Sequence, residues 1–207
     1  MRGRFLAFEG IDGSGKSSQR ILVAERLRAA GIDVIETREP GGTPLAERFR
    51  ELMLSMHSEP VSPKTEMLSM FASREQHLEV LIRPALAAGK WVLTDRFVAS
   101  SYAYQVHGRG MPESLFNSLC EHIVGDTMPD ITFVFDMPDE VARARLLARS
   151  GKNDRLDNEA AAFYQRANNA LRELASRPGY QRINADQPIE AVTDEIVSYL
   201  LDSYPLT

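Results

Sequence analysis

Short apolar runs alternate with longer segments of helical periodicity along most of the chain. Five runs each predict a β-strand: 5–9 (FLAFE), 33–37 (DVIET), 91–95 (WVLTD), 131–136 (ITFVFD) and 180–184 (YQRIN). Helical patterns begin near residues 16, 45, 63 and 189, and Gly31 and Gly89 stop two helices before the next strand. Strands that alternate with helices are typical of right-handed βαβ units. We therefore expect an α/β fold with a largely parallel sheet covered on both faces.

Composition then narrows the class of protein. The 207 residues suit a single domain, and the formal charge of −5 argues against a nucleic-acid-binding surface. No apolar run approaches the roughly 18 residues of a membrane helix, and MRGRF leads into a strand without a secretory apolar region. With Cys120 as the single cysteine, we expect a cytoplasmic protein. The histidines show no metal-ligand spacing, so we expect structural or surface roles for His57, His77, His107 and His122.

The first predicted strand runs into a glycine-rich loop. Residues 10–17, GIDGSGKS, match the phosphate-binding pattern G-x-x-x-x-G-K-[ST]. The glycines let several backbone N–H groups converge on one anion, and the helix that begins near Lys16 adds its dipole. The loop therefore predicts a nucleotide phosphate site, in which Lys16 reaches the phosphates and the Ser17 hydroxyl can ligate Mg²⁺.

Charged residues follow the second, third and fourth strands, at the sheet edge where ligands bind in such folds. Arg38-Glu39 precedes a Pro-Gly-Gly turn, and Asp95-Arg96 ends the third strand. Asp95 can orient Mg²⁺ and Arg96 can hold a phosphate, but solvated or structural ion pairs explain both dipeptides as well. After the fourth strand, the motif Asp136-Met-Pro favours a carboxylate that caps the next helix.

A charge interrupts the apolar stripe of the long third helix. The stripe is formed by Met67, Met70, Phe71, Leu78 and Leu81, and Arg74 falls in its middle. A lone guanidinium cannot be buried cheaply, so either an acidic side chain pairs with it or the stripe lines a ligand pocket. An aromatic plane beside a forked donor suits a planar base with carbonyl groups. The alternative is a core Phe71 beside a snorkelling Arg74.

Two further segments are candidates for ligand contact. Ser101, Tyr104 and Gln105 share a helix face after the third strand, where they could read a base and a sugar or form an ordinary amphipathic end. Cations gather at about residues 143–156, which we interpret as a lid that lowers arginines onto phosphates. A solvated basic helix end explains this second segment equally well.

Together these motifs resemble the bacterial thymidylate (dTMP) kinases, which are P-loop nucleoside monophosphate kinases. The resemblance rests on FEGIDGSGKSS, TREPGGT, the helix with Phe71 and Arg74, TDRFVASSYAYQ and the arginine-rich segment before Asp154-Arg155. The resemblance covers nearly the whole chain. It implies ATP + dTMP → ADP + dTDP with Mg²⁺, one P-loop kinase domain over residues 1–207 with a five-stranded parallel sheet in three layers, and a homodimer.

For the dTMP site, the resemblance implies a set of residue roles. Phe71 would stack on thymine, and Arg74 would hydrogen-bond a base carbonyl. Ser101 and Gln105 would lie at the base edge, and Tyr104 would crowd the 2′ position. The sugar 3′-hydroxyl and the acceptor phosphate would be held by Asp12, Arg38 and Arg96.

For ATP and Mg²⁺, the resemblance implies the loop residues Gly10, Asp12, Gly13, Ser14, Gly15, Lys16, Ser17 and Ser18. The metal would be held by Ser17, Glu39 and Asp95, directly or through water. Lys16, Arg96, Asp12 and Glu39 would belong to the catalytic set. Because loop positions 11–14 carry no arginine, the resemblance implies the subtype with a lid arginine, which would be Arg149, with Arg145 and Arg155 as alternatives.

Two other functions fit parts of the pattern. A deoxynucleoside kinase or another nucleoside monophosphate kinase shares the loop, but a nucleoside kinase needs a carboxylate base, for which Asp12 or Glu39 could serve. A nucleotide-binding switch protein also shares the loop. Guanine-reading switches usually carry Asn-Lys-x-Asp after a strand, and this motif does not occur in the sequence.

Overall fold

A five-stranded parallel sheet forms the centre of the protein in a computed structural model that describes residues 2–148, 155–156 and 159–204. The strands are β1 (Phe5–Gly10), β2 (Val34–Arg38), β3 (Trp91–Asp95), β4 (Ile131–Asp136) and β5 (Tyr180–Asn184), in the order β2-β3-β1-β4-β5. All four neighbouring pairs are parallel. The predicted α/β class and parallel sheet are confirmed, and each predicted strand lies within a residue of its observed bounds.

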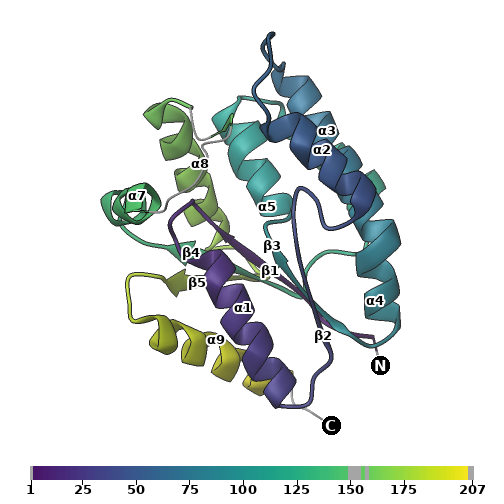
Figure 1. The fold of residues 1–207 in the computed structure, drawn as a ribbon, viewed down its shortest axis with the longest axis vertical. Coiled ribbons are helices and arrows are strands. Elements are labelled where there is room, and N and C mark those ends of the chain that lie inside the picture. Colours follow the sequence, from purple (N-terminus) through teal and green to yellow (C-terminus); the bar gives the residue numbers. More distant parts are fainter. Residues whose placement is uncertain (1, 149–154, 157–158, 205–207) are drawn as a thin grey trace.

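The side chains of β1 alternate between the two faces of the sheet and fill two separate cores. Leu6 and Phe8 pack with α1 (Lys16–Ala29) and α9 (Ile189–Ser203), whereas Phe5 and Ala7 pack with the helices of the opposite face. Figure 1 shows α1 and α9 on one side of the sheet and α3, α5 and α8 on the other. The three layers follow from this two-residue alternation on strands that are buried on both faces.

The helices of the second face carry most of the candidate residues. In chain order, the helical segments between β2 and β3 are α2 (Pro44–Leu54), α3 (Pro63–His77), the π-helical η1 (Leu78–Ile82) and α4 (Arg83–Ala87). Those between β3 and β4 are α5 (Val98–Ser101), the π-helical η2 (Tyr102–Gly108), α6 (Glu113–Leu119) and the π-helical η3 (Cys120–Val124). Between β4 and β5 lie α7 (Asp139–Ala148) and α8 (Ala161–Leu174), and α8 packs on η2.

The π-helical turn η1 changes the apolar stripe that the sequence predicts for α3. Met67, Phe71 and Leu78 are fully buried as expected, but Ile82 is buried in place of the predicted Leu81. A π-turn takes more residues per turn than an α-helix, so the buried face has shifted by one position at its last residue, Ile82. None of the described helices is long and apolar enough to cross a lipid bilayer.

Candidate active site

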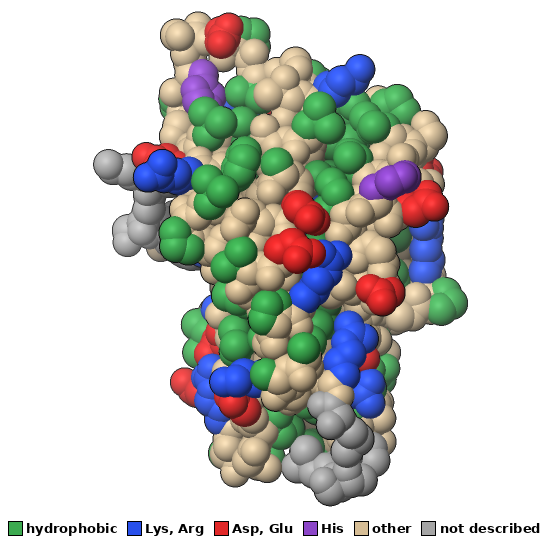
Figure 2. Space-filling model, turned by 90° about the vertical axis from the view of Figure 1, so that its right-hand side faces the viewer, with side chains coloured by type: hydrophobic (Ala, Val, Ile, Leu, Met, Phe, Trp, Pro, Cys, Tyr) green, Lys and Arg blue, Asp and Glu red, His purple; other side chains and the backbone are tan. Residues whose placement is uncertain are grey.

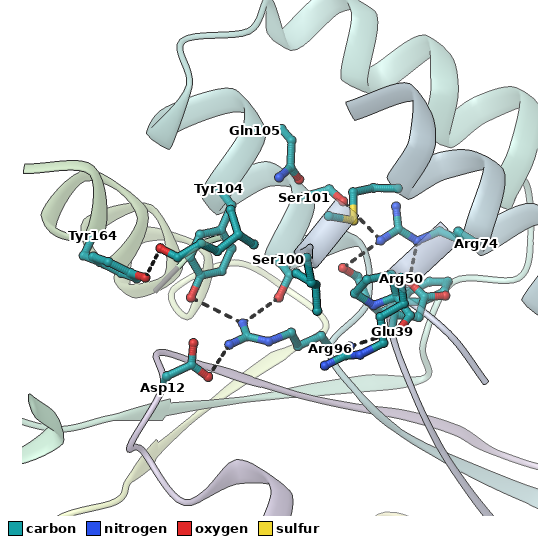
Figure 3. Close-up of a pocket in the computed structure, with 15 residues that line it drawn as sticks. Asp12, Glu39, Arg50, Arg74, Arg96, Ser100, Ser101, Tyr104, Gln105 and Tyr164 are labelled. Carbon is teal, nitrogen blue, oxygen red and sulfur yellow. Dashed lines mark hydrogen bonds and ion pairs between the residues drawn. The ribbon is translucent and has the colours of Figure 1, made fainter. Parts of the chain in front are cut away.

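One pocket lies where the carboxyl ends of β1, β2 and β3 meet the helices of the second face (Figure 3). Loops after the strands form its floor, and α2, α3, α5, η2 and α8 contribute its walls. The lining residues are Asp12, Glu39, Pro40, Arg50, Leu54, Met70, Arg74, Arg96, Phe97, Ser100, Ser101, Tyr104, Gln105, Leu156 and Tyr164. The pocket is therefore built from segments that are remote in sequence, as expected at the edge of a parallel sheet.

The glycine-rich loop joins β1 to the first turn of α1. Gly13 has φ 87°, and a Cβ there would lie 2.1 Å from the Ala142 carbonyl oxygen, so only glycine lets this loop pass so close to α7. The Lys16 side chain is 6% exposed, and its Nζ donates to Asp12 Oδ1 at 2.9 Å. The loop and the amino end of α1 thus supply an ammonium group and free backbone donors at one point, which is the arrangement that binds phosphate.

Arg96 occupies the centre of the pocket floor. Its φ of 68° is unusual for a residue with a side chain, and such strained backbone is common at functional sites. The guanidinium donates from Nη2 to Asp12 Oδ1 at 2.7 Å and from Nη1 to Ser100 Oγ at 3.1 Å and Tyr104 Oη at 3.3 Å. Arg96 therefore connects the glycine-rich loop with α5 and η2, as the dashed lines of Figure 3 show.

A single carboxylate joins the two cations of the pocket floor. Burial alone would raise the pKa of Asp12, but the charges of Arg96 and Lys16 outweigh burial and hold this pKa well below its usual range. The Asp12 side chain is 36% exposed, so a more highly charged anion could reach the same cations. Asp12 thus occupies a position among the cations that a phosphate oxygen could also take.

Ser17 and Asp95 form a second polar group beside the loop. The Ser17 hydroxyl donates to Asp95 Oδ2, while Asp95 Oδ1 is buried and has no hydrogen-bond partner among the described residues. An orphaned buried carboxylate oxygen needs a donor, a water or a cation. Within the part of the chain that the structure describes, no three His, Cys, Asp or Glu side chains could hold a metal ion by themselves. The pair therefore fits Mg²⁺, which usually combines one or two carboxylates with water and substrate phosphates.

A buried chain of polar side chains crosses the opposite end of the pocket. Arg74 is 3% exposed; its Nε donates to Glu39 Oε2 at 2.8 Å, and its Nη2 donates to Ser101 Oγ and the Phe97 carbonyl, each at 3.1 Å. The predicted acidic partner of Arg74 is therefore Glu39. The third nitrogen, Nη1, is buried without a partner among the described residues, and Figure 3 shows it without a dashed line.

Glu39 is itself held from two sides. Its Oε1 lies 3.0 Å from His77 Nδ1, and His77 Nε2 lies 2.7 Å from Thr37 Oγ1. Both carboxylate oxygens are thus engaged, one by Arg74 and the other by His77. Glu39 is the acidic partner of the buried Arg74, and its expected part in holding the metal, directly or through water, stays a prediction.

The apolar side chain that faces the pocket from α3 is not the one that the sequence suggested. Met70 lines the pocket, whereas Phe71 has no exposed surface and packs edge-on against Phe116 at a centroid distance of 5.9 Å. Phe71 lies behind the Arg74 guanidinium, which is 4.6 Å from its ring centroid. The expected stacking of Phe71 on a base is thus replaced by a supporting contact beneath Arg74, because adjacent helix positions point about 100° apart.

The remaining wall is formed by α5 and η2. Ser101, Tyr104 and Gln105 all line the pocket, and their expected contacts with a base and a sugar stay predictions. Burial raises the pKa of Tyr104 to about 12, although Arg96 opposes this shift, so its hydroxyl stays protonated at neutral pH. Tyr104 and Gln105 lie on a π-helical segment, a distortion that is frequent at functional sites.

Arg38 and the two alternatives for the lid arginine, Arg145 and Arg155, do not line the pocket. Arg38 ends β2, but it is exposed, donates to Glu47 Oε2 at 2.9 Å, and does not line the pocket. Arg145 donates to the Ala185 carbonyl, and Arg155 binds the Met53 carbonyl and Glu66. Arg149 lies outside the described residues.

Sequence reasoning missed several residues of the pocket region. Arg50 and Tyr164 line the pocket, and His77 and Glu66 support it from behind. The sequence contained one indication of the buried network around Arg74, which was that this charge needs a partner. It did not indicate which residue the partner would be.

Outside the pocket, Asp136 does not cap α7 as predicted, because its carboxylate accepts from Arg172 and Arg182.

Comparisons with known proteins agree with the geometry. A family model described as thymidylate kinase matches residues 8–196. Thymidylate kinases of Pseudomonas fluorescens (strain Pf0-1) and Pseudomonas savastanoi pv. phaseolicola are 48% and 45% identical over 207 residues, with 98% of each chain covered. The crystal structure of thymidylate kinase from Ehrlichia chaffeensis matches with a TM-score of 0.79 and 32% identity, over 97% of this chain and 100% of that one.

Proposed function

The chain belongs to the thymidylate kinase family, and we propose that it phosphorylates dTMP to dTDP with ATP at the pocket described above. The observation that carries the proposal is that one pocket has two chemically different ends. Lys16 and Arg96 gather at the phosphate-binding loop, and Arg74 presents a buried donor between apolar side chains at the other end. This arrangement suits a nucleotide whose phosphate points to the loop and whose base points to α3.

We assign the base to the Arg74 end. Arg74 Nη1 donates to a base carbonyl, Met70 packs against the ring, and Ser101 and Gln105 lie along its edge. Tyr104 crowds the sugar, and its hydroxyl is fixed by Arg96 at 3.3 Å. The support is that all of these residues line one pocket, while Phe71, which does not line it, holds Arg74 from behind.

The phosphoryl transfer is carried out by positioning and charge neutralisation. ATP phosphates bind at the loop residues Gly10, Gly13, Ser14, Gly15, Ser17 and Ser18, with Lys16 beside them. Arg96 holds the acceptor phosphate, and Arg38 joins it by exchanging Glu47 for a phosphate oxygen. Fixed cations oppose the repulsion between the two nucleotides, and in-line positioning supplies most of the rate.

Mg²⁺ completes the ATP site in this proposal, held by Ser17 and Asp95. When bound, it neutralises charge on the phosphate groups. The support from this chain is the buried, unpartnered Oδ1 of Asp95 beside the Ser17 hydroxyl. Removal of Mg²⁺ with a chelator should abolish turnover, while dTMP should still bind, because the base end contains no group assigned to the metal.

We further propose that Arg149 supplies the positive charge that the lid adds during transfer. Arg145 and Arg155 are weaker candidates, because Arg145 is bound to the Ala185 carbonyl and Arg155 to Glu66. A supplied arginine is worth about 10³–10⁵ in rate in related phosphoryl transfers. An Arg149→Ala variant should therefore lose turnover far more than dTMP affinity.

A phosphate acceptor fits the pocket better than a sugar hydroxyl. A nucleoside kinase needs a carboxylate base, but Asp12 holds two cations and its pKa lies well below the usual range, so it accepts a proton poorly. Glu39 is occupied by Arg74 and His77. A dTMP phosphate is already largely a dianion at pH 7, since its second pKa is about 6, and it needs no base.

A homodimer and a cytoplasmic location complete the proposal. Helix α2 exposes Leu45 and Leu52, α3 exposes Leu68 and η1 exposes Val80. Figure 2 shows hydrophobic side chains spread over this side of the molecule, which suits contact with a second copy. Burial raises the pKa of the Cys120 thiol to about 11, so it stays protonated, and nothing in its setting calls for an oxidising compartment.

The direct test is an acceptor panel assayed with ATP and Mg²⁺. We expect rapid ADP formation with dTMP and little with thymidine, dCMP or dGMP. Comparable rates with thymidine would favour a nucleoside kinase. Slow ATP or GTP hydrolysis at a rate that does not change with any acceptor would instead favour a nucleotide-binding switch.

A further inference from the structure

Glu66 is a fully buried carboxylate behind the base end of the pocket. It lies in the first turn of α3, has no exposed surface, and does not line the pocket. Its Oε1 accepts from Gln105 Nε2 at 2.9 Å and Arg109 Nε at 3.2 Å. Its Oε2 accepts from Arg109 Nη2 at 3.1 Å and Arg155 Nη2 at 2.6 Å. Three donor side chains therefore converge on one anion.

This anion dictates how the Gln105 amide is turned. An amide can present either its NH₂ or its oxygen to a neighbour, but an ionised carboxylate only accepts hydrogen bonds. Gln105 must therefore turn Nε2 to Glu66. Its Oε1 receives no hydrogen bond from the described residues, and Figure 3 shows it on the side of Ser101 and Arg74. The group that remains for a ligand in the pocket is thus an acceptor.

Arg74 supplies the complementary donor on the same wall. Its Nη1 is buried without a described partner, while Nη2 is bound to Ser101. A donor from Arg74 next to an acceptor from Gln105 matches a pyrimidine with a 4-carbonyl and an N3–H. A 4-amino pyrimidine reverses both positions, so it would set donor against donor and acceptor against acceptor.

We propose that Glu66 is a positioning residue that fixes the donor–acceptor polarity of the base-reading wall, and thereby selects 4-oxo over 4-amino pyrimidines. Glu66 acts only through the Gln105 amide and touches no substrate. This inference rests on the proposed assignment of the base to the Arg74 end. It adds a specificity determinant that lies outside the pocket lining.

The isosteric change Glu66→Gln tests this role because it alters hydrogen-bond polarity at nearly constant volume. The introduced amide NH₂ faces two arginine donors if it takes the place of Glu66 Oε2. If it takes the place of Oε1, the Arg109 Nε is the one arginine donor that it faces. The second arrangement is less repulsive. It sets the introduced amide NH₂ against Gln105, which then turns its own oxygen to that NH₂ and its own NH₂ to the pocket.

The experiment measures kcat/KM of the full chain for dTMP, dUMP and 5-methyl-dCMP. 5-Methyl-dCMP keeps the methyl group of dTMP and reverses the pattern at positions 3 and 4, whereas dUMP keeps the pattern and lacks the methyl. We expect E66Q to lower the preference for dTMP over 5-methyl-dCMP by about 10- to 100-fold, since one mismatched buried hydrogen bond is relieved. Its preference for dTMP over dUMP should stay within about threefold of wild type.

Matched variants separate polarity from charge and packing. Glu159→Gln neutralises the other carboxylate on Arg109, whose Nη2 lies 2.6 Å from Glu159 Oε1, without contact to Gln105, and it should leave both preferences unchanged. Glu66→Asp keeps an acceptor-only group and should retain the preference against 5-methyl-dCMP even if KM rises. Gln105→Leu removes the reading group and should lower that preference whether or not E66Q folds.

Each outcome decides the proposal. If folded E66Q lowers turnover of all three nucleotides equally, Glu66 is merely structural and the proposal fails. If E66Q does not fold, an unchanged preference in Q105L overturns it. A wild-type chain that does not phosphorylate dTMP would instead defeat the proposed function, and this result is distinct because it needs no variant.

Discussion

The two ends of the pocket differ in how their carboxylates are exposed and paired. At the phosphate end, Lys16 and Arg96 share Asp12, a carboxylate that is 36% exposed. At the base end, Glu39 and Glu66 are almost completely buried, and each is saturated by donors from the surrounding protein. The phosphate end therefore offers its cations through a partly exposed internal partner, which an incoming phosphate can reach. The base end keeps its shape and polarity before any ligand arrives.

The comparison teaches where binding energy and specificity originate. Asp12 is the more exposed member of its ion pairs, and an incoming phosphate carries more negative charge, so the phosphate can compete with Asp12 for Lys16 and Arg96. Buried carboxylates behave differently, because loss of one partner leaves an uncompensated charge. Substitutions at the phosphate end should consequently affect turnover, while those at the base end should affect both stability and the choice of acceptor.

The largest expected effect comes from Lys16→Ala. This change removes the ammonium group from the loop, and kcat should fall by about 10²–10³-fold or more, as for the loss of one preorganised donor to a reacting group. The free energy of unfolding should change much less than the activation free energy. A coupled assay of ADP formation measures kcat, and Lys64→Ala, at an exposed position of α3, is the control. Near-normal turnover in K16A would break the assignment of the phosphate end.

Arg74→Ala should produce the next largest effect, and it should do so at the base end. The variant leaves Glu39 buried with His77 alone, so unfolding free energy should fall by about 3–5 kcal/mol. The affinity for dTMP should drop by at least about tenfold, because a buried donor to the base is lost. Calorimetric titration should find ATP affinity nearly unchanged. Equal weakening of both nucleotides would contradict the division of the pocket into two ends.

His77→Gln should have a smaller effect of the same kind. His77 connects Thr37 to Glu39, and a Cβ on Gly42 would lie 2.4 Å from its Nε2, which shows how closely the ring is enclosed. Loss of one buried hydrogen bond costs about 1–3 kcal/mol. We expect KM for dTMP to rise about threefold to tenfold while kcat stays within about twofold. His57→Gln, at an exposed position of the chain, is the matched control. A fall in kcat at constant KM would place His77 in the phosphate end instead.

The smallest expected effect is a pH dependence that Asp12→Asn should remove. The folded-state pKa of Asp12 lies below its unfolded value of about 3.9, so Asp12 adds stability above that pH and loses it as the pH falls toward the folded-state pKa. The stability difference between wild type and D12N should be about 1 kcal/mol near pH 7, because water screens this partly exposed group. Urea unfolding at pH 7, 5, 4 and 3 should show the difference shrink below about pH 4. A constant difference would mean that Asp12 carries no such pairing.

The sequence predicted the parts of this molecule that depend on local patterns. The strand bounds follow from apolar runs, and the phosphate loop follows from the spacing of Gly10, Gly15 and Lys16. The buried charge of Arg74 was also visible, since its place in an apolar stripe can be computed from helix geometry alone. These predictions needed no knowledge of what lies across the pocket.

Other features depended on contacts between distant segments or on small rotations. Glu39 and His77 are 38 positions apart, and a turn residue and a helix residue give no sign that they will be paired. Glu66 resembles an ordinary acidic residue in the first turn of a helix. Met70 and Phe71 differ by one position, and which of them faces the pocket depends on how α3 lies against the sheet, which periodicity does not determine.

A crystal structure with dTMP and a non-hydrolysable ATP analogue would test the central contrast most directly. We predict that Arg74 keeps Glu39, that Gln105 keeps Glu66, and that both bind the base without exchanging these partners. Lys16 and Arg96 should instead exchange Asp12 for phosphate oxygens. A complex in which the Arg74–Glu39 pair is broken, or in which Lys16 and Arg96 still hold Asp12 and touch no phosphate, would contradict the account.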